Sequence, residues 1–366
     1  MGAQRLVALD VLRGLTIALM IMVNNPGSWA YVYPPLRHAK WHGCTPTDLV
    51  FPFFLFIVGV SMWFSFKKFG NGITKKGFQK VLKRTLVIFG LGLFLNLFPY
   101  FNFEKLRIFG VLQRIAVAYG IGALLCMHFN TKQLKYILAF ILLGYWVLLY
   151  VGSSEGPYEL ATNVVRKFDL FVLGESHVYK GFGIPFDPEG ILSSIPSVAT
   201  VILGYYSGKL VETAKSTWEA VKKLIGYGIV GVALGLLWDM VFPINKALWT
   251  SSYVLYVGGL AMLFLALLIF IIDIKKWGTW SKPFVHFGMN PLFIYMFSGL
   301  YVQMIIYLVR INVDGEAISG YAYLYKHIFV PIAGNMNGSL LFAVSHIIGF
   351  WFLTYILYKR KIFIKI

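Results

Sequence analysis

Two histidines and an aspartate stand close together in one loop between two apolar segments. His38 and His42 lie among aromatic residues, and Asp48 follows at the start of the next apolar segment. Imidazole accepts a proton near neutral pH, and a neighbouring carboxylate orients it and stabilises its cationic form. Histidines four residues apart would suit a metal on a helix, but the loop contains Gly43 and Pro46 and offers no third ligand nearby. The pattern therefore predicts either acid–base chemistry or an ordinary polar loop, and no metal site.

The loop over residues 152–190 carries a second candidate, the acidic pair Asp187 and Glu189. They stand in FDPEGILSSIPS, directly before an apolar segment. Asp-Pro followed by Glu-Gly is typical of a helix start, where carboxylates lie near the positive end of the helix dipole. Capping alone would explain both residues, and contact with a polar or cationic substrate is the alternative. The remaining acidic residues of this loop are expected to be solvated: Glu155, Glu159, Asp169 and Glu175.

The composition decides what kind of fold must position these residues. The chain has 366 residues, of which 58% are hydrophobic and 13% are charged. Soluble proteins have roughly 45–50% apolar and about 25% charged residues, and a single soluble core stops growing near about 250–300 residues. The apolar stretches, about 18–25 residues long, can cross a bilayer as helices. The sequence predicts an all-α, polytopic transmembrane helical bundle, with residues 1–366 as one domain, and excludes a soluble enzyme.

About ten membrane spans are expected from the apolar stretches. They cover roughly residues 6–23, 49–66, 80–98, 111–128, 134–151, 191–210, 221–241, 252–272, 284–309 and 337–358. The segment 320–333 is apolar but too short to span, and Pro331 interrupts it. It is interpreted as an interfacial or re-entrant segment.

The formal net charge is +18, from 33 Lys and Arg residues against 15 Asp and Glu residues. The basic residues cluster in short loops between spans, which indicates membrane orientation rather than nucleic-acid binding. Roughly two thirds of them fall on one side, which is therefore expected to be cytoplasmic. An even span count places both termini there, and the His38 loop outside.

Polar residues also fall within or at the ends of the expected spans. Asp10 and Arg13 are three apart on one helix face and could form an ion pair. The others include Asn24, Arg107, Gln113, Arg114 and Asn290. Such groups are costly in hydrocarbon and usually face a cavity or a partner. Together they predict a polar cavity through the bundle.

Six blocks of sequence, in this order, resemble the heparan-α-glucosaminide N-acetyltransferase family of membrane acetyltransferases and its bacterial relatives. The blocks are RLVALDVLRGLTIALMIMVNN, HAKWHGCTPTDLVFPFFLFIVG, RIFGVLQRIAVAY, FDPEGILSSIPSVATVILG, FPINKALWTSSYVL and GMNPLFIYMFSG. The resemblance runs from residue 5 to about 358, and the second block is the most specific. It implies a bacterial-type member that lacks the luminal domain of the animal enzyme. A bacterial member would be located in the inner (plasma) membrane.

The resemblance implies an enzyme that moves an acetyl group from cytoplasmic acetyl-CoA to a sugar amine across the membrane. The family's histidine stands in an H-A-x-W-x-G stretch that falls on His38, and the aspartate of its D-L-V-F-P run falls on Asp48. The family's asparagine at the end of the first span falls on Asn24, although the following loop differs in length. The candidate acceptor-binding residues are Asn24, Trp41, Asp187 and Glu189. No role is carried over to His42.

Amide formation from a thioester needs an unprotonated amine, a base and donors for the developing oxyanion. His38 could be that base, or it could accept the acetyl group first and pass it on. Lys83 and Arg84, at the inner edge of the third span, suit the phosphates of acetyl-CoA. Gln113, Arg114 and Asn290 are candidates to line the path of the pantetheine arm or to polarise the thioester.

Two other functions fit parts of the pattern. An amino-sugar transporter or permease would also use about ten spans and a polar cavity, but the sequence shows no paired halves with matching interruptions. An O-acetyltransferase of a cell-wall or surface glycan is the second alternative. The expected acceptor is a glucosamine-type or cell-wall sugar rather than a heparan polymer. The sequence is compatible with a homodimer.

Overall fold

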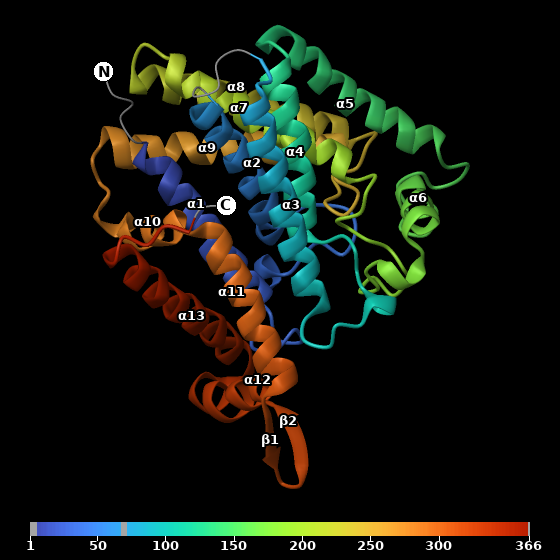
Figure 1. Cartoon of the computed structure of the whole chain (residues 1–366), viewed down its shortest axis with the longest axis vertical. Helices are drawn as coiled ribbons and strands as arrows, with labels where there is room; N and C mark the ends of the chain where they lie inside the picture. The colour runs from blue at the N-terminus through green and yellow to red at the C-terminus, as the bar shows by residue number, and fades with distance from the viewer. Residues whose placement is uncertain (1–5, 67–71, 365–366) are drawn as a thin grey trace.

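The computed structural model describes residues 6–66 and 72–364, and it is built almost entirely of helices (Figure 1). The long helices are α1 (Val7–Asn24), α2 (Pro46–Phe66), α3 (Lys75–Leu97), α4 (Val111–His128), α5 (Thr131–Val151), α7 (Ser194–Thr213), α8 (Thr217–Asp239), α9 (Ser251–Leu268), α11 (Pro291–Gln303) and α13 (Val330–Lys359). The shorter elements are α6 (Val164–Leu173), α10 (Lys282–Met289), α12 (Gly320–Leu324), β1 (Arg310–Val313) and β2 (Glu316–Ser319). The predicted all-helical bundle is therefore confirmed.

Within the described residues, eight helices are long and apolar enough to cross a membrane. Helices α3 and α7 also correspond to expected spans but do not reach this apolar character. The first turns of α3 are rich in lysine, and α7 carries buried serine and threonine residues. The count of ten spans and the cytoplasmic placement of the termini stay predictions.

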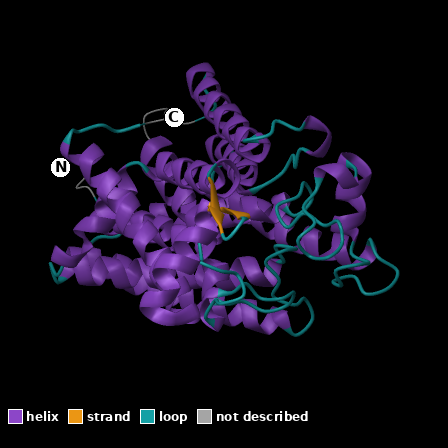
Figure 2. Ribbon diagram, turned by 90° about the horizontal axis from the view of Figure 1, so that it is seen from below, coloured by secondary structure: helices purple, strands orange, loops and turns teal. Residues whose placement is uncertain are grey.

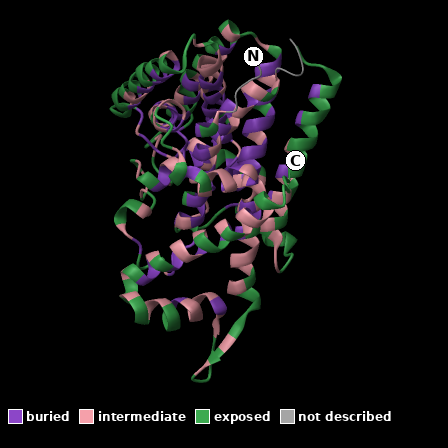
Figure 3. Cartoon of the chain, turned by 90° about the vertical axis from the view of Figure 1, so that its left-hand side faces the viewer, coloured by how far each residue is buried: buried purple, intermediate pink, exposed green. Residues whose placement is uncertain are grey.

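The centre of the bundle forms where helices approach closely through glycine. Helix α7 packs along α2, and a Cβ atom added at Gly204 would lie 2.0 Å from the carbonyl oxygen of Phe56. A Cβ atom at Gly59 would meet the carbonyl oxygen of Val201 at the same distance. Small residues of this kind let membrane helices pack backbone to backbone. Buried residues concentrate in the central helices, while the outer helices carry exposed side chains (Figure 3).

The ion pair expected in the first span is present. Arg13 Nη1 lies 3.2 Å from Asp10 Oδ1, and Arg13 Nη2 donates to Ser61 Oγ on α2 at 2.7 Å. Arg13 therefore ties α1 to α2 at membrane depth.

Two features of the C-terminal third refine the expected spans. A proline inside the expected span 284–309 predicts a kink there, and the span consists of two helices, α10 and α11, which are separated at Asn290, because Pro291 cannot continue the α10 hydrogen bonds. The segment 320–333 is helical: α12 runs through a π-helical turn, Tyr325–Phe329, into α13, and the chain breaks at Gly334 with φ of 73°. It is thus helical, and its interfacial or re-entrant placement stays a prediction.

A β-hairpin of β1 and β2 precedes α12 and projects from one end of the molecule (Figure 1). Its turn is Asp314-Gly315, with φ of 52° and 90°. The dipeptide Asp-Gly is a strong hairpin signal, because both positions tolerate positive φ. The sequence therefore contained a usable indication of this hairpin, which the spans alone did not reveal.

The loops expected outside the membrane contact one another and gather on one side of the bundle (Figure 2). Gly43 N donates to the Ile244 carbonyl at 2.7 Å, and Ile108 N donates to that of His177 at 3.1 Å. Four segments that are distant in sequence thus meet around one site.

Candidate active site

His38 and Asp48 form a hydrogen-bonded pair at the start of α2. His38 Nδ1 lies 2.6 Å from Asp48 Oδ1. The other carboxylate oxygen accepts from Ala39 N at 3.0 Å, Thr45 N at 3.1 Å and Thr45 Oγ1 at 3.0 Å. The Asp48 side chain is 2% exposed and that of His38 is 46% exposed. A buried carboxylate in the first turn of α2 therefore organises the loop and fixes the imidazole ring.

The pairing assigns the tautomer of His38. A carboxylate only accepts hydrogen bonds, so Nδ1 carries the proton in the contact with Asp48. Nε2 is then an unprotonated nitrogen with a free lone pair. This is the arrangement that a general base or a nucleophilic imidazole requires.

Lys246 is the third member of the His38–Asp48 group, and it was not among the residues predicted for the site. Its Nζ lies 3.3 Å from Asp48 Oδ1 and 3.2 Å from His38 Nδ1. Lys246 belongs to the turn between α8 and α9. The Asn245 side chain stabilises this turn, because its Oδ1 accepts a hydrogen bond from Leu248 N at 2.8 Å. The FPINKALW block contained this lysine, but no local pattern points it toward His38.

The other reactive groups of the loop are placed less favourably. His42 Nε2 lies 3.9 Å from Glu159 Oε1, and its Nδ1 lies 3.4 Å from the Asn245 amide nitrogen. Burial, together with the charge of Asp48, raises the pKa of Cys44 to about 12, so its thiol stays protonated. Among the described residues, no group of three or more His, Cys, Asp or Glu side chains is arranged to hold a metal ion.

A cavity of about 300 Å³ opens in front of His38, and we call it the outer cavity. The side chains that could bind or process a polar ligand in it are Asn24, His38, Trp41, Asp48, Arg107, Tyr179, Glu189 and Lys246. Trp41 packs edge-on against Phe182 and Phe186, with ring centroids 5.8 and 5.3 Å away. Five residues selected from the sequence therefore line the same cavity: Asn24, His38, Trp41, Asp48 and Glu189.

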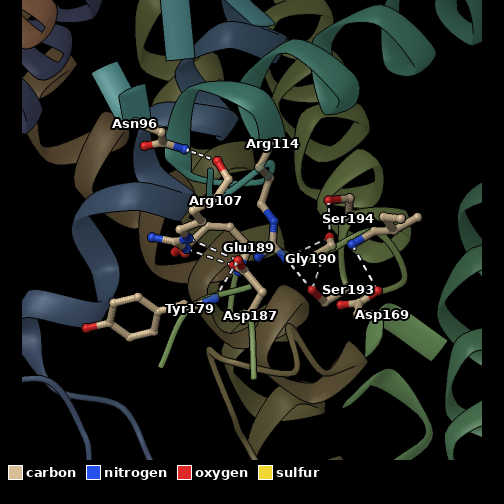
Figure 4. Close-up of polar contacts among 11 residues, drawn as sticks. Asn96, Arg107, Arg114, Asp169, Tyr179, Asp187, Glu189, Gly190, Ser193 and Ser194 are labelled. Atoms are coloured by element: carbon tan, nitrogen blue, oxygen red, sulfur yellow. Dashed lines mark hydrogen bonds and ion pairs between the residues drawn. The ribbon is translucent and has the colours of Figure 1, made fainter. Parts of the chain in front are cut away.

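Arg107 binds both members of the acidic pair (Figure 4). Its Nη2 lies 2.7 Å from Asp187 Oδ1 and 2.5 Å from Glu189 Oε2, and its Nε donates to Asp187 Oδ2 at 2.9 Å. Burial opposes ionisation of Glu189, but the charge of Arg107 prevails and lowers the pKa of that carboxyl. One guanidinium group therefore binds two carboxylates at the wall of the outer cavity.

Two expectations about this pair need correction. Asp187 does not cap a helix, because α7 begins only at Ser194. Its side chain is fully buried and occupied by Arg107, by Tyr179 N and by Glu189 N, so it is not open to a substrate. Glu189 keeps 12% of its side chain exposed and lines the outer cavity.

Beneath this pair lies a second polar group, also drawn in Figure 4. Asp169 was expected to be solvated, but it is buried and accepts from Ile191 N at 3.1 Å and Leu192 N at 3.2 Å. Its burial raises the pKa of this carboxyl to about 7. Arg114 is fully buried, contacts Ser193 Oγ, and stacks on the Trp249 ring with its guanidinium carbon 4.9 Å from the centroid. The Asp169 contacts hold the segment before α7 against α6, and the Arg114 contact holds it against α4.

Gln113 and Arg114 do not line the outer cavity or the second large cavity described below. Within the described residues, Gln113 Nε2 and the Nε and Nη1 atoms of Arg114 have no hydrogen-bond partner. The two side chains are therefore part of the packed layer behind the acidic pair.

A larger cavity of about 820 Å³ lies further along the bundle, and we call it the inner cavity. It is bounded by α1, α2, α3, α4 and α11, and most of its wall is apolar. Its polar side chains are Arg13, Ser61, Ser65, Lys80, Arg84 and Tyr119. The Arg84 guanidinium carbon lies 4.7 Å from the centre of the Tyr119 ring.

Of the two basic residues expected to bind a nucleotide, only Arg84 lines this cavity. Lys80 takes the place expected for Lys83. Residues four apart share one helix face, so Lys80 and Arg84 face the cavity together with Ile88, while Lys83 is exposed on another part of α3.

The two cavities follow one another along the same helices. Residues Thr47–Phe51 of α2 reach the outer cavity, and residues Phe54–Ser65 reach the inner one. On α4, Val111 lines the outer cavity, whereas Ile115 and Tyr119 line the inner one. At about 1.5 Å per residue, the cavities cover about 27 Å of α2. One turn of α2 separates them.

Asn290 has a role other than the one expected. Its Nδ2 donates to the Ile362 carbonyl at 3.0 Å, and its Oδ1 accepts from Ile364 N at 2.7 Å. The neighbouring residues Met289 and Pro291 line the inner cavity, as does Ile364, but Asn290 does not. Asn290 therefore fastens the C-terminal segment beside the inner cavity.

Comparisons with known proteins identify the family of this chain. The profile described as "Heparan-alpha-glucosaminide N-acetyltransferase, catalytic" matches residues 5–235. The human heparan-alpha-glucosaminide N-acetyltransferase is 27% identical over 421 residues, which cover 99% of this chain and 60% of the human protein. The mouse protein of the same name is 28% identical over 357 residues, which cover 81% of this chain and 53% of its own length. This chain thus spans less than two thirds of either relative. It belongs to the heparan-α-glucosaminide N-acetyltransferase family.

Proposed function

We propose that this protein transfers an acetyl group from cytoplasmic acetyl-CoA to the amine of a glucosamine-type sugar on the other side of the membrane. The observation that carries the proposal is the succession of two cavities along α2. The inner cavity has basic residues for phosphates and an apolar wall for a pantetheine arm. The outer cavity holds the His38–Asp48 pair.

The reaction balances with His38 as the proton acceptor. The sugar nitrogen attacks the thioester carbonyl, and His38 Nε2 takes the proton that the nitrogen loses. The carbon–sulfur bond then breaks, and the imidazolium returns the proton to the departing CoA thiolate. In the alternative route His38 Nε2 attacks the thioester first, the carbon–sulfur bond breaks, and CoA leaves as its thiolate. The acetyl group then passes from the cationic ring to the amine, and the proton that the amine loses goes to the thiolate. The hydrogen bond from Nδ1 to Asp48 supports both routes, because the imidazole ring becomes cationic in each and the carboxylate stabilises that charge.

The outer cavity favours one sugar unit as acceptor. Its volume of about 300 Å³ lies at the small end of ligand-binding pockets. Trp41, Tyr179 and Phe182 offer aromatic faces of the kind on which sugar rings pack, and Glu189 offers a carboxylate to an amine. The proposed acceptor is therefore an amino sugar or the exposed end of a cell-wall glycan.

The proposed orientation places both termini, and the open end of the inner cavity, in the cytoplasm of a bacterium. Acetyl-CoA carries phosphates and does not cross a bilayer unaided, so it must enter from that side. Cysteines introduced at Ser28 and Ser216 should react with a membrane-impermeant maleimide from opposite faces. Labelling of both from one face would refute the orientation.

The transfer itself is tested in sealed proteoliposomes of known orientation, with labelled acetyl-CoA on one face and glucosamine derivatives on the other. Acetylated sugar should form across the membrane, and His38→Ala should abolish it while His42→Ala retains it. Product that appears only when both substrates share a face would refute transmembrane transfer. Sugar uptake without acetylation would identify a transporter instead.

A further inference from the structure

Asp48 is a buried carboxylate with two candidate counter-charges. Its side chain is 2% exposed, and a nearby positive charge stabilises the ionised form of a buried carboxylate beyond what its hydrogen bonds provide. Two groups reach it: His38, if the imidazole is protonated, and Lys246, whose side chain is 20% exposed. Among the described residues, no other cationic side chain lies within 4.0 Å of this carboxylate.

We propose that Lys246 is a positioning residue that neutralises Asp48 and thereby keeps His38 as the neutral imidazole that accepts a proton or an acetyl group. The inference rests on the proposed function, because it assigns a purpose to Nε2 of His38. It concerns a residue from a different part of the chain, the turn between α8 and α9.

The hydrogen positions support this role. Nδ1 of His38 donates to Asp48, so it has no lone pair left to accept from Lys246. The ammonium therefore donates to Asp48 Oδ1, which lies 3.3 Å from Nζ. Nζ also lies 3.2 Å from His38 Nδ1 because both nitrogens donate to the same carboxylate oxygen. A second positive charge on the ring at this distance would be repelled by the ammonium.

In the proposed resting state the group contains one negative charge, one positive charge and a neutral ring. Without Lys246, no ammonium opposes a proton on His38, and the Asp48 carboxylate attracts that proton, which places a hydrogen on Nε2. That form can neither accept the amine proton nor attack a thioester. The lysine consequently preserves the reactive form of the ring without touching the substrate.

Other charged groups around the outer cavity are placed less directly. Arg107 is paired with Asp187 and Glu189, as described above. Lys40 is exposed and lines the cavity, and it offers a matched control of equal charge. His42 contacts Asn245 rather than the His38 ring.

The position of Lys246 is held by backbone contacts. Gly43 N donates to the Ile244 carbonyl at 2.7 Å, and Asn245 N donates to Thr250 Oγ1 at 3.0 Å. The first contact joins the turn to the loop that carries His38, and the second stabilises the turn itself, so the ammonium reaches Asp48 without reordering of the turn.

The experiment measures the protonation of His38 directly. Of the two forms of a histidine ring, diethylpyrocarbonate reacts with the neutral one, and peptide mass spectrometry reports carbethoxylation of His38 separately from that of other residues. The full-length protein is titrated from about pH 5 to about pH 9 in four forms: wild type, Lys246→Met, Lys246→Arg and Lys40→Met. Lys246→Met should move the midpoint upward by about 0.5–1 pH unit, a modest shift because His38 is half exposed. Lys246→Arg and Lys40→Met should remain near the wild-type midpoint.

A midpoint that is unchanged or lowered in Lys246→Met would overturn the proposal, as would an equal upward shift in Lys40→Met or Lys246→Arg. If Lys246→Met does not fold, Lys246→Gln removes the same charge with a polar side chain and is judged by the same criterion. Acetyl transfer measured in parallel should be lost at low pH in Lys246→Met and recover at high pH. Should wild type transfer no acetyl group, the proposed function fails, while the carbethoxylation midpoints still decide the role of Lys246.

Discussion

Replacing Asp48 by asparagine should leave the loop in place and disable His38. The amide oxygen can take the place of Oδ2, which accepts from Ala39 N and from both donors of Thr45. The amide nitrogen then replaces Oδ1 and faces His38 Nδ1 and the Lys246 ammonium. As a donor, it forces Nδ1 to accept, so the single ring proton moves to Nε2. The nitrogen that faces the outer cavity loses its lone pair.

The expected changes in kcat and in stability follow from the interactions that Asp48→Asn removes. A positioned general base contributes about 10²–10⁴-fold to rate, so kcat of Asp48→Asn should fall by about 10²–10⁴. The protein loses about 1–3 kcal/mol of stability, because the buried carboxylate gave charge-assisted hydrogen bonds. Initial rates with labelled acetyl-CoA and thermal unfolding in detergent measure the two effects separately. Thr45→Val is the control, since it removes one donor to Oδ2 and leaves Oδ1 untouched; its kcat should stay within a few-fold of wild type. An Asp48→Asn enzyme whose kcat lies within about tenfold of wild type would refute the tautomer argument.

Three further predictions concern other parts of the molecule. Lys80→Met should raise the KM for acetyl-CoA by about 10–100-fold, because a charged contact is worth about 1.5–3 kcal/mol, whereas Lys83→Met should change this KM little. Steady-state kinetics in which Lys83→Met raises the KM more than Lys80→Met would contradict this. Burial raises the pKa of Asp169 from 3.8 to about 7, so the folded state binds a proton that the unfolded chain has released, and stability should fall as pH rises from about 4 to about 7. Asp169→Asn should remove this fall in thermal unfolding curves, and an identical pH dependence in both proteins would argue against it. Asn290→Ala should free residues 362–364, seen as faster amide hydrogen exchange there, while Asn290→Asp should preserve the bond from Ile364 and lose the one to Ile362.

Much of the fold was predictable because it depends on local sequence. Apolar segments of membrane-spanning length become helices whatever their neighbours, since backbone groups in hydrocarbon must bond within their own segment. The break before Pro291 and the Asp314-Gly315 turn also follow from local backbone chemistry. His38 and Asp48 lie only ten residues apart in the chain, so their pairing could be predicted from the sequence.

The roles of the acidic residues were not predictable in this way. Asp187 carried a pattern typical of a helix start, yet Arg107 from another loop binds it. Asp169 resembled a solvated loop residue, yet it is buried under the start of α7. In both cases the deciding partner comes from a segment that is distant along the chain, and local patterns contain no information about such partners.

The sequence by itself determined a helical bundle with membrane-spanning segments and the proximity of His38 to Asp48. Hydrophobic length and short-range spacing are properties of a single segment, and both survive whatever the tertiary arrangement. Only the tertiary structure decided that Lys246 reaches Asp48, that Lys80 rather than Lys83 faces the inner cavity, and that Asn290 holds the C-terminal segment. Each of these depends on the rotation of a helix or on the meeting of distant loops. Packing of the whole bundle determines both, because ion pairs and cavities form between segments rather than within them.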